Sequence, residues 1–287
     1  MIVVRIWEGL GNQMFQYAYA RALAAKGQDV RLDMNKAYDR AFAKYKNNAY
    51  RQNSIQNFRI SLPTIDVCAY GKYAYLDQNT IIRKVVFWLA CHSLWKYRFY
   101  EEVLQGYSEK SAKLRKNCYI KGWFQSEKYF QDIRPTLLKE FTPRKKIRIS
   151  GNFKRILENE ECISLHVRRG DYVRIHHVLH PIYYKNAISY MSGIYHDPVF
   201  LVFSDDLEWV KRNIPIEGRC IYVNEDGNLK DYEELFIMSR CKSNIISNST
   251  FSWWGAWLNR HEDKTVVAPK IWMDGQSGIV PDKWIVL

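Results

Sequence analysis

An apolar run, Cys162-Ile163-Ser164-Leu165, leads directly into His166-Val167-Arg168-Arg169-Gly170-Asp171-Tyr172. Alternate side chains of a strand share a face, so Ser164, His166 and Arg168 are expected on the face opposite Leu165 and Val167. Gly170 breaks the strand at the edge of a sheet, which is where open α/β proteins bind their ligands. The stretch therefore predicts a strand that brings one histidine and one arginine to a common position.

Arg168 is the candidate ligand-binding residue of this stretch. A planar guanidinium grips a phosphate through paired, charge-assisted hydrogen bonds. An arginine pair taken alone would favour a plain surface ion pair with Asp171. The order of histidine, arginine, glycine, aspartate and tyrosine at the end of a strand favours an anion site instead.

Length and composition limit the class of protein. A chain of 287 residues fits two α/β domains better than one core. Its aromatic content of 15% supplies flat apolar faces that suit nucleobases and sugars. The formal net charge of +13 points to nucleic acid, an anionic membrane surface or a small phosphorylated substrate. Lysine and arginine are scattered apart from one cluster at 144–148, and there is no zinc-finger spacing or basic amphipathic helix, so we expect no nucleic acid.

Cysteine usage and hydropathy bear on the cellular location. Six cysteines are widely spaced and form no C-x-x-C pair. Those in apolar runs, such as Cys162 and Cys220, are typical of buried thiols in a reducing compartment. The chain opens with a strand-like pattern instead of a signal peptide, and its longest apolar block, 85–91, is shorter than the roughly 20 residues of a membrane span. We expect a cytoplasmic protein with peripheral contact to an anionic inner-membrane surface.

The N-terminal half begins as a strand, a glycine-containing turn and a helix. Ile2–Ile6 is rich in β-branched residues, Glu8-Gly9-Leu10-Gly11-Asn12-Gln13 follows, and a helical pattern runs from Met14 to Ala25. A dinucleotide-binding turn would need a third glycine where Met14 stands, and no Walker lysine is present. What remains is a tight turn whose backbone N–H groups and Asn12 and Gln13 amides can hold a polar group. A turn that only packs is equally compatible with these residues.

Further elements are expected in both halves. The N-terminal half adds strands at 30–33 and 119–124, a helix running on from Ser126, and helical stretches within 81–95. The basic, proline-containing stretch 142–151 is interpreted as a linker, which gives domains 1–145 and 146–287. In the second domain the patterns predict helices at 153–157, 183–191, 207–212, 231–240 and 252–259, and strands at 162–168, 199–203, 220–223, 244–247 and 266–268, the last closing the sheet.

Three strands of the second domain end at polar residues: Arg168, Asp205 and Asn248-Ser249-Thr250-Phe251-Ser252. The carboxyl ends of parallel strands lie along one edge, so these groups are expected to converge. Ser249 and Thr250 precede a helix, where hydroxyls and free N–H groups can receive a phosphate. Asp205 can accept paired hydrogen bonds from the N1–H and N2–H₂ edge of guanine. A helix N-cap is the plainer interpretation of Asp205, and it is compatible with that role.

Five sequence strings, GLGNQMFQYAYARAL, GWFQSEKYF, HVRRGDY, FSDD and IISNSTFSWWGAWLN, together resemble the bacterial α-1,2-fucosyltransferases of glycosyltransferase family 11. The likeness covers both halves of the chain. It implies a GT-B fold, an α/β architecture of two Rossmann-like domains facing each other across a cleft. It also implies GDP-β-L-fucose as donor, inversion at the anomeric carbon, and no required metal or other cofactor, in agreement with a sequence that lacks an Asp-x-Asp pair.

The resemblance also implies roles for single residues. Arg168 falls on the position that binds the β-phosphate in related fucosyltransferase families, Asp205 falls where those families read guanine, and Ser249 lies in the donor-binding stretch. The residues expected to bind the donor are Gly11, Asn12, His166, Arg168, Asp205, Asn248, Ser249, Thr250 and Phe251.

Catalysis is expected to involve Arg168, His166 and Asp171. Arg168 would stabilise the charge that develops on the departing diphosphate. The proton of the acceptor hydroxyl would pass to Asp171, His166 or Glu8, and the sequence leaves these three alternatives open. Glu8 stands where the family usually has glycine, and we favour a tolerated substitution over a dedicated base.

The sequence thus predicts an inverting galactoside α-1,2-fucosyltransferase that acts in O-antigen or capsule synthesis on a galactoside-containing glycan. One alternative is a GT-B enzyme with another donor or linkage. A basic nucleic-acid-binding protein ranks lower. The stretch 34–119, whose pattern is hard to interpret, is expected to build the acceptor site.

Overall fold

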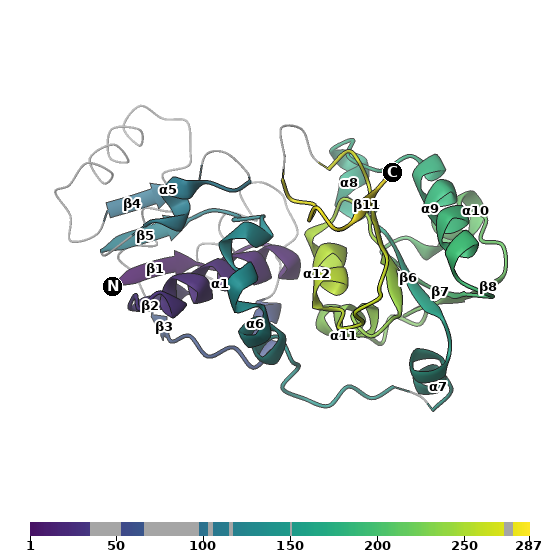
Figure 1. Cartoon of the computed structure of the whole chain (residues 1–287), viewed down its shortest axis with the longest axis horizontal. Coiled ribbons are helices and arrows are strands. Elements are labelled where there is room, and N and C mark those ends of the chain that lie inside the picture. Colours follow the sequence, from purple (N-terminus) through teal and green to yellow (C-terminus); the bar gives the residue numbers. More distant parts are fainter. Residues whose placement is uncertain (35–52, 66–97, 103–105, 115–116, 150, 273–277) are drawn as a thin grey trace. The chain divides into compact units, whose positions relative to one another are not determined.

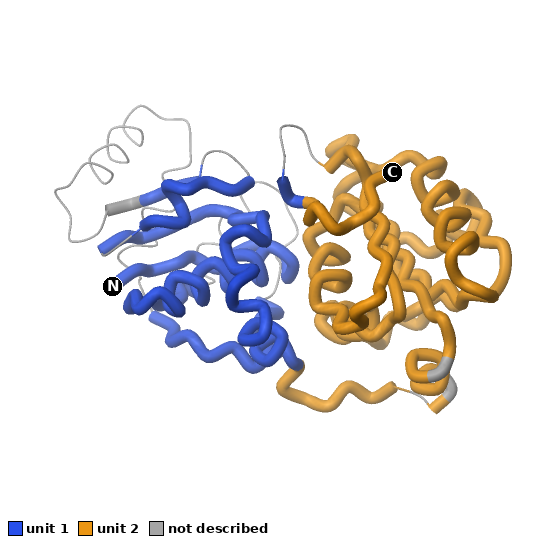
Figure 2. Tube along the Cα trace, in the orientation of Figure 1, with its two compact units in different colours: residues 1–142, 277–279 blue, residues 143–276, 280–287 orange. Residues whose placement is uncertain are grey.

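The computed structural model describes residues 1–34, 53–65, 98–102, 106–114, 117–149, 151–272 and 278–287. The chain divides into two compact units, Met1–Thr142 with Ser277–Ile279 and Pro143–Gln276 with Val280–Leu287 (Figure 2). Each unit has its own sheet, and the paired strands run parallel in both. Within the described ranges, none of the helices combines the length and the apolar character of a membrane span.

The first unit is built on a sheet with the strand order β3-β2-β1-β5-β4 (Figure 1). The strands are β1 (Ile2–Arg5), β2 (Val30–Asp33), β3 (Thr64–Ile65), β4 (Arg98–Glu101) and β5 (Cys118–Lys121). The described helical segments are α1 (Leu10–Ala25), α5 (Glu109–Ala112) and α6 (Arg134–Glu140), with 3-10 turns η1 (Ser54–Asn57), η3 (Glu127–Tyr129) and η4 (Gln131–Ile133). The central strands β1 and β5 are short and buried on both faces, as parallel strands are when helices cover the sheet.

Helix α1 begins earlier than the sequence pattern suggested. It starts at Leu10, and Gln13 N already donates to Gly9 O at 3.0 Å. Gly11, Asn12 and Gln13 therefore lie in the first turn of the helix, and not in a loop before it. The correction matters because a helical turn fixes the directions of these side chains.

Strand β5 ends at Lys121, and the expected strand to Phe124 is too long. The Glu102 carboxylate accepts hydrogen bonds from Trp123 N at 2.6 Å and Phe124 N at 2.8 Å, which bends the chain away from the sheet. The helix expected from Ser126 is resolved into η3 and η4 followed by α6. The helical stretches expected within 81–95, and most of the stretch 34–119, lie outside the described residues.

The second unit has a sheet with the strand order β11-β10-β9-β6-β7-β8 (Figure 1). Its strands are β6 (Cys162–Val167), β7 (Val199–Ser204), β8 (Arg219–Tyr222), β9 (Ser243–Ile245), β10 (Val266–Ala268) and β11 (Ile285–Val286). Its helices are α7 (Gly151–Asn159), α8 (Gly170–Arg174), α9 (Pro181–Ile194), α10 (Leu207–Asn213), α11 (Asp231–Met238) and α12 (Thr250–Leu258). The predicted elements are all present with small shifts of their ends, but β10 does not close the sheet, because β11 pairs with it.

Strand β6 alternates between two cores, one on each face of the sheet. Ile163, Leu165 and Val167 pack in the core that also takes residues of α9 and α10. Cys162 packs on the other side with residues of α7 and α11. The predicted division into two faces is therefore confirmed as far as Val167, with His166 on the face of Cys162, but the strand ends one residue before Arg168.

The chain returns briefly to the first unit near its end. Ser126 Oγ donates to Gly278 O at 3.2 Å, and Ile279 is buried. The predicted boundary at 145/146 differs from the division described above in two places, since residues 143–145 belong to the second unit and Ser277–Ile279 to the first. Of the two thiols predicted to be buried, Cys162 is buried and Cys220 is only half-buried.

Candidate functional site

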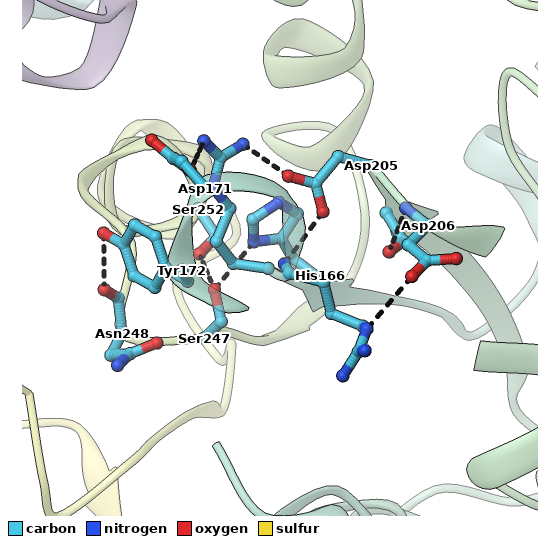
Figure 3. Close-up of polar contacts among 11 residues, drawn as sticks. His166, Asp171, Tyr172, Asp205, Asp206, Ser247, Asn248 and Ser252 are labelled. Carbon is cyan, nitrogen blue, oxygen red and sulfur yellow. Dashed lines mark hydrogen bonds and ion pairs between the residues drawn. The ribbon is translucent and has the colours of Figure 1, made fainter. Parts of the chain in front are cut away.

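The candidate site lies at the carboxyl end of β6. In the strand order of the second unit, β7 lies on one side of β6 and β9 on the other, so the chain winds in opposite directions from this point. Open parallel sheets bind ligands at such switch points. The polar groups that follow β6, β7 and β9 are the three groups expected to converge, and hydrogen bonds join them (Figure 3).

The Arg168 side chain is held by two carboxylates. Its Nη2 donates to Asp171 Oδ1 at 2.5 Å, and its Nη1 lies 2.8 Å from Asp205 Oδ2. The guanidinium carbon lies 5.4 Å from the centroid of the Tyr172 ring. The side chain is 20% exposed, so its fork is ordered but remains within reach of a ligand.

Asp205 is bound on both oxygens. Its Oδ1 accepts a hydrogen bond from Arg169 N at 2.8 Å, and its Oδ2 faces Arg168. The carboxylate also lies against the Cα of Gly170, where an added Cβ would come within 2.5 Å of Oδ2. Glycine at this position therefore does more than end a strand, because it leaves room for the Asp205 carboxylate beside Arg168.

The helix N-cap after β7 is Asp206, and the interpretation of Asp205 as the cap is wrong. The Asp206 side chain accepts from Trp209 N at 3.1 Å. Its other oxygen accepts from Arg169 Nε at 3.1 Å, and the Arg169 guanidinium stacks on the Trp209 ring at 3.6 Å. Arg169 thus contacts the first turn of α10 and its cap. Arg168 is the arginine that remains at the edge of the sheet.

His166 is a neutral, buried side chain. Its Nδ1 lies 2.9 Å from Ser247 Oγ, and its ring centroid lies 5.6 Å from that of Phe251. Burial first, and the charge of Arg168 second, lower the pKa of His166 to about 3. A histidine that resists protonation in this way is poorly suited to take a proton from an acceptor hydroxyl. Ser247, which orients it, was not singled out from the sequence, although a serine ending the apolar run of the expected strand 244–247 was a signal.

Asn248 holds the loops around the site together. Its Nδ2 donates to His177 O at 2.8 Å and to Trp272 O at 3.1 Å, and its backbone carbonyl accepts from Tyr172 Oη at 3.3 Å. Both amide hydrogens are used by these backbone contacts. The side chain is therefore a clamp, and its buried Oδ1 has no hydrogen-bond partner among the described residues.

The amino end of α12 faces the same edge of the sheet. Ser249 is its N-cap, with an extended backbone and no hydrogen bond from its own side chain to the helix. Thr250 and Phe251 form the first turn, and their backbone N–H groups have no acceptor within the helix. The Phe251 ring packs against the core and is partly buried, and its contact with a ligand stays a prediction. This end offers hydroxyl and N–H donors to an anion.

Gly11 and Asn12 lie in the first unit, on α1, and their contribution to donor binding stays a prediction. Asn12 Nδ2 donates to Glu8 Oε2 at 2.6 Å. Gln13 is buried, with its Nε2 on Glu8 O at 2.6 Å and its Oε1 accepting from Ile55 N at 3.1 Å. The expectation that the Gln13 amide faces a ligand is wrong, because backbone groups occupy it.

The family model of glycosyl transferase family 11 matches residues 1–279. The chain belongs to glycosyl transferase family 11. Two curated proteins of Escherichia coli are similar over nearly the whole length of both chains. The O-antigen biosynthesis glycosyltransferase WbnK is 33% identical over 97% of this chain and 98% of its own. An alpha-1,2-colitosyltransferase is 32% identical over 99% of this chain and 98% of its own.

A solved structure supports the fold of this family 11 glycosyltransferase. A mutant of FUT1 from Arabidopsis thaliana in complex with GDP is 13% identical and aligns over 93% of this chain and 70% of that one with a TM-score of 0.51. The predicted GT-B type with two Rossmann-like domains is confirmed. That the two domains face each other across a cleft stays a prediction.

Sequence reasoning missed a mostly buried carboxylate of this glycosyltransferase, Glu234 on α11, to which Asn224 Nδ2 donates a hydrogen bond. Burial raises the pKa of Glu234 to about 7, and the charges of Asp231 and Asp205 add to the rise. Two adjacent glutamates on an amphipathic helix look like a solvent-exposed face in the sequence, so no signal was available.

No group of three or more metal-binding side chains occurs in the part of the chain that the structure describes.

Proposed function

We propose that this family 11 glycosyltransferase moves L-fucose from GDP-β-L-fucose to the 2-hydroxyl of a galactoside, with inversion, in the synthesis of a surface glycan such as O-antigen. One observation supports the proposal most directly. The Arg168 guanidinium and the amino end of α12, whose first N–H groups have no acceptor in the helix, lie at the same edge of the sheet. The relative named for O-antigen synthesis supports the pathway, and the relative named for α-1,2 transfer supports the linkage. The motif strings shared with the α-1,2-fucosyltransferases support the sugar.

Donor binding is proposed to proceed by exchange at Arg168. The diphosphate replaces the carboxylates of Asp171 and Asp205 on the guanidinium, and Ser249 and Thr250 add hydroxyl and N–H donors. Asp205 Oδ2, released from Arg168, then accepts from the N–H edge of guanine. In this scheme Arg168 gains the diphosphate and Asp205 gains the guanine edge, so neither of these partly buried groups is left without a partner.

The transfer step follows from the same contacts. The acceptor hydroxyl attacks the anomeric carbon from the face opposite the diphosphate, and the bond from that carbon to the β-phosphate oxygen breaks. Arg168 stabilises the negative charge that appears on GDP, so the residues of this chain can promote departure without a divalent metal. Asp171, once the diphosphate has displaced it from Arg168, takes the proton of the acceptor hydroxyl.

The donor has one close rival. Colitose is L-fucose without its 3-hydroxyl, and the relative named as a colitosyltransferase is as similar to this chain as the relative named WbnK. A site that hydrogen-bonds the 3-hydroxyl of fucose would reject the deoxy sugar strongly. A comparison of GDP-fucose with GDP-colitose therefore decides between the two donors.

The experiment incubates the purified protein with each GDP-sugar and a panel of galactosides in EDTA, and detects products by mass spectrometry. Fucosylated product in EDTA supports the proposal, whereas transfer of colitose alone, or a requirement for added metal, contradicts it. Arg168→Ala should lower the rate about 1000-fold or more, and Arg168→Lys nearly as much, because lysine cannot make the paired contact. An active Arg168→Ala enzyme would remove the basis of the donor site.

We also propose that the enzyme works at an anionic membrane surface on the cytoplasmic side. Four apolar side chains from α8 to the first turn of α9 are exposed, namely Val173, Ile175, Val178 and Ile182. The sequence from Tyr172 to His196 contains arginine, lysine and four histidines but no aspartate or glutamate. Exposed aliphatic groups within a stretch free of negative charge suit the interface of an anionic bilayer.

A further inference from the structure

A polar and aromatic cluster lies at the switch point of the sheet in the first unit. Strand β1 has β2 on one side and β5 on the other, so the carboxyl ends of β1 and β5 mark the position where this sheet would bind a ligand. The residues that follow these two strands include Trp7, Glu8, Trp123 and Gln125, and Asn12 joins them from α1. We call these five residues the Glu8 cluster.

Glu8 is held in a conformation that favours glycine. Its φ is 64°, in the left-handed region. Gln13 Nε2 fixes the turn by donating to Glu8 O at 2.6 Å. The Glu8 carboxylate accepts from Asn12 Nδ2 at 2.6 Å and from Trp123 Nε1 at 3.1 Å, both on Oε2. Non-glycine residues in such conformations are concentrated at functional sites, where the contacts of the side chain offset the backbone strain.

The carboxylate determines which way the Asn12 amide points. Glu8 can only accept hydrogen bonds, so the amide nitrogen of Asn12 must face it. The amide oxygen then accepts from Gln125 Nε2 at 2.8 Å. Asn12 and Glu8 are both partly exposed, so a ligand meets a donor and an acceptor of fixed orientation side by side.

Two indole rings border these polar groups. The centroids of Trp7 and Trp123 lie 5.4 Å apart, with their planes inclined by 42°, and both side chains are partly exposed. The Lys121 ammonium lies 5.2 Å from the Trp7 centroid and bonds to Glu101 at 2.9 Å. The Trp7 ring is thereby held in place by a cation on one face.

These groups fit a neutral sugar and do not fit a diphosphate. A pyranose presents an apolar C–H face to an indole ring and hydroxyls to carboxylates and amides. The Glu8 carboxylate would repel a diphosphate, which is the part of the donor that Arg168 is suited to bind in the second unit. We infer that the Glu8 cluster binds the acceptor sugar, with Glu8 as a specificity-determining residue. The inference rests on the proposed function, and it assigns Asn12 to the acceptor instead of to the donor.

The first test is Glu8→Gly, which removes the carboxylate and at the same time relieves the backbone. The variant should unfold at the same or a higher temperature than the wild type, because glycine suits a φ of 64°. We expect its KM for the galactoside to rise about 10- to 100-fold, the cost of losing hydrogen bonds to a charged group. KM for GDP-fucose and the rate of GDP-fucose hydrolysis should change less than about twofold.

Asn117→Gly is the matched control. Asn117 also has a positive φ, 49°, and it directly precedes β5, at the amino end of the strand. The substitution changes backbone strain in the same unit without touching the Glu8 cluster, and acceptor KM should not move. Trp123→Phe keeps an aromatic face but loses the indole N–H, so its acceptor KM should rise about 3- to 10-fold.

The second test measures sugar binding without transfer. Saturation-transfer NMR with methyl β-galactoside should give a signal from the wild type and from Asn117→Gly, and none from Glu8→Gly. An unchanged acceptor KM in Glu8→Gly, an equal NMR signal from that variant, or no signal from the wild type would overturn the inference. If the wild type used no GDP-sugar at all, the proposed function would fail, and the NMR comparison would still decide whether the cluster binds a sugar.

Discussion

Arg168 Nη1 lies 2.8 Å from Asp205 Oδ2, and the same guanidinium donates to Asp171 Oδ1 at 2.5 Å. The two carboxylates occupy the donor directions that the oxygens of a diphosphate would use. A guanidinium stays charged at all relevant pH values, so Arg168 can exchange a carboxylate for a diphosphate without losing its own charge. In the proposed exchange, donor binding releases Asp205, and the guanine edge is the new partner of the released oxygen.

Asp205→Asn tests this exchange through the base. The guanine of GDP offers N1–H and N2–H₂, whereas inosine diphosphate lacks the 2-amino group. We expect the wild type to bind GDP at least about 10-fold more tightly than inosine diphosphate, because a lost hydrogen bond to a carboxylate costs about 1.5 kcal/mol or more. Asparagine has one acceptor oxygen and no charge, so the variant should lose this preference while it still binds pyrophosphate. Isothermal titration calorimetry with the three ligands gives the answer.

Asp206→Asn is the comparison variant. Asp206 caps α10 and bonds to Arg169. Asparagine caps a helix as well as aspartate does, so only the ion pair with Arg169 is weakened. The free energy of unfolding should fall by no more than about 1 kcal/mol, and the preference for GDP should not change. Equal preferences in Asp205→Asn and the wild type would show that another residue recognises the base. Glu234, whose pKa is raised to about 7 by burial, would then be the next residue to substitute.

Gly170→Ala should impair the site through a single methyl group. A Cβ at this position would come within 2.5 Å of Asp205 Oδ2, so the carboxylate must leave Arg168 or the turn must shift. We expect KM for GDP-fucose to rise about 10-fold.

Gly193→Ala is the control, because a Cβ there meets nothing within 4 Å. Gly193 lies inside α9, and alanine should stabilise it by about 0.5–1 kcal/mol with unchanged kinetics. Identical kinetic constants for both variants would rule out the steric role of Gly170.

His166 should make the second unit sensitive to acid. Its pKa is about 3 in the folded chain, lowered by burial and by Arg168, against 6.5 as the ordinary value. As the pH falls, the unfolded chain therefore binds the proton first. The contribution of neutral His166 to the free energy of unfolding is complete above pH 6.5 and is lost as the pH falls toward 3. The full loss is about 5 kcal/mol on a scale of 1.36 kcal/mol per pKa unit. Urea unfolding of His166→Asn between pH 7 and pH 4 should show a weaker dependence than the wild type, and exposed His176→Asn should match the wild type. A parallel decline in all three proteins would assign the acid sensitivity to other groups.

The sequence could predict the part of the site that depends on strand periodicity and sheet topology. The alternation of Leu165 and Val167 against His166 follows from the pleat alone. The meeting of Arg168 with Asp205 follows from the rule that parallel strands end at one edge. Both expectations required no knowledge of how side chains pack.

The remaining details depended on tertiary contacts that a local pattern does not encode. Asp205 and Asp206 both follow β7, and only the positions of Arg168 and Trp209 decide which one caps α10. Gln13 seemed available to a ligand because a glutamine at a helix start is usually exposed, but residues from η1 fold over it and take its amide. The final strand β11 is two residues long, too short for any periodicity to reveal.

Membrane contact through the exposed apolar residues from α8 to the first turn of α9 can be tested on vesicles. Ile175 and Ile182 are 48% and 52% exposed, and replacing both with aspartate removes apolar area and adds negative charge where none exists. We expect binding to vesicles of phosphatidylglycerol and phosphatidylcholine to fall at least about 10-fold, because each buried isoleucine contributes more than about 1 kcal/mol, while transfer to a soluble galactoside stays unchanged. Ile271→Asp places one such charge at a residue that is 71% exposed and outside this segment, and it should bind like the wild type. Co-sedimentation at low and high salt measures all three proteins, and wild-type binding that is equal on vesicles without phosphatidylglycerol would contradict the electrostatic part of the proposal.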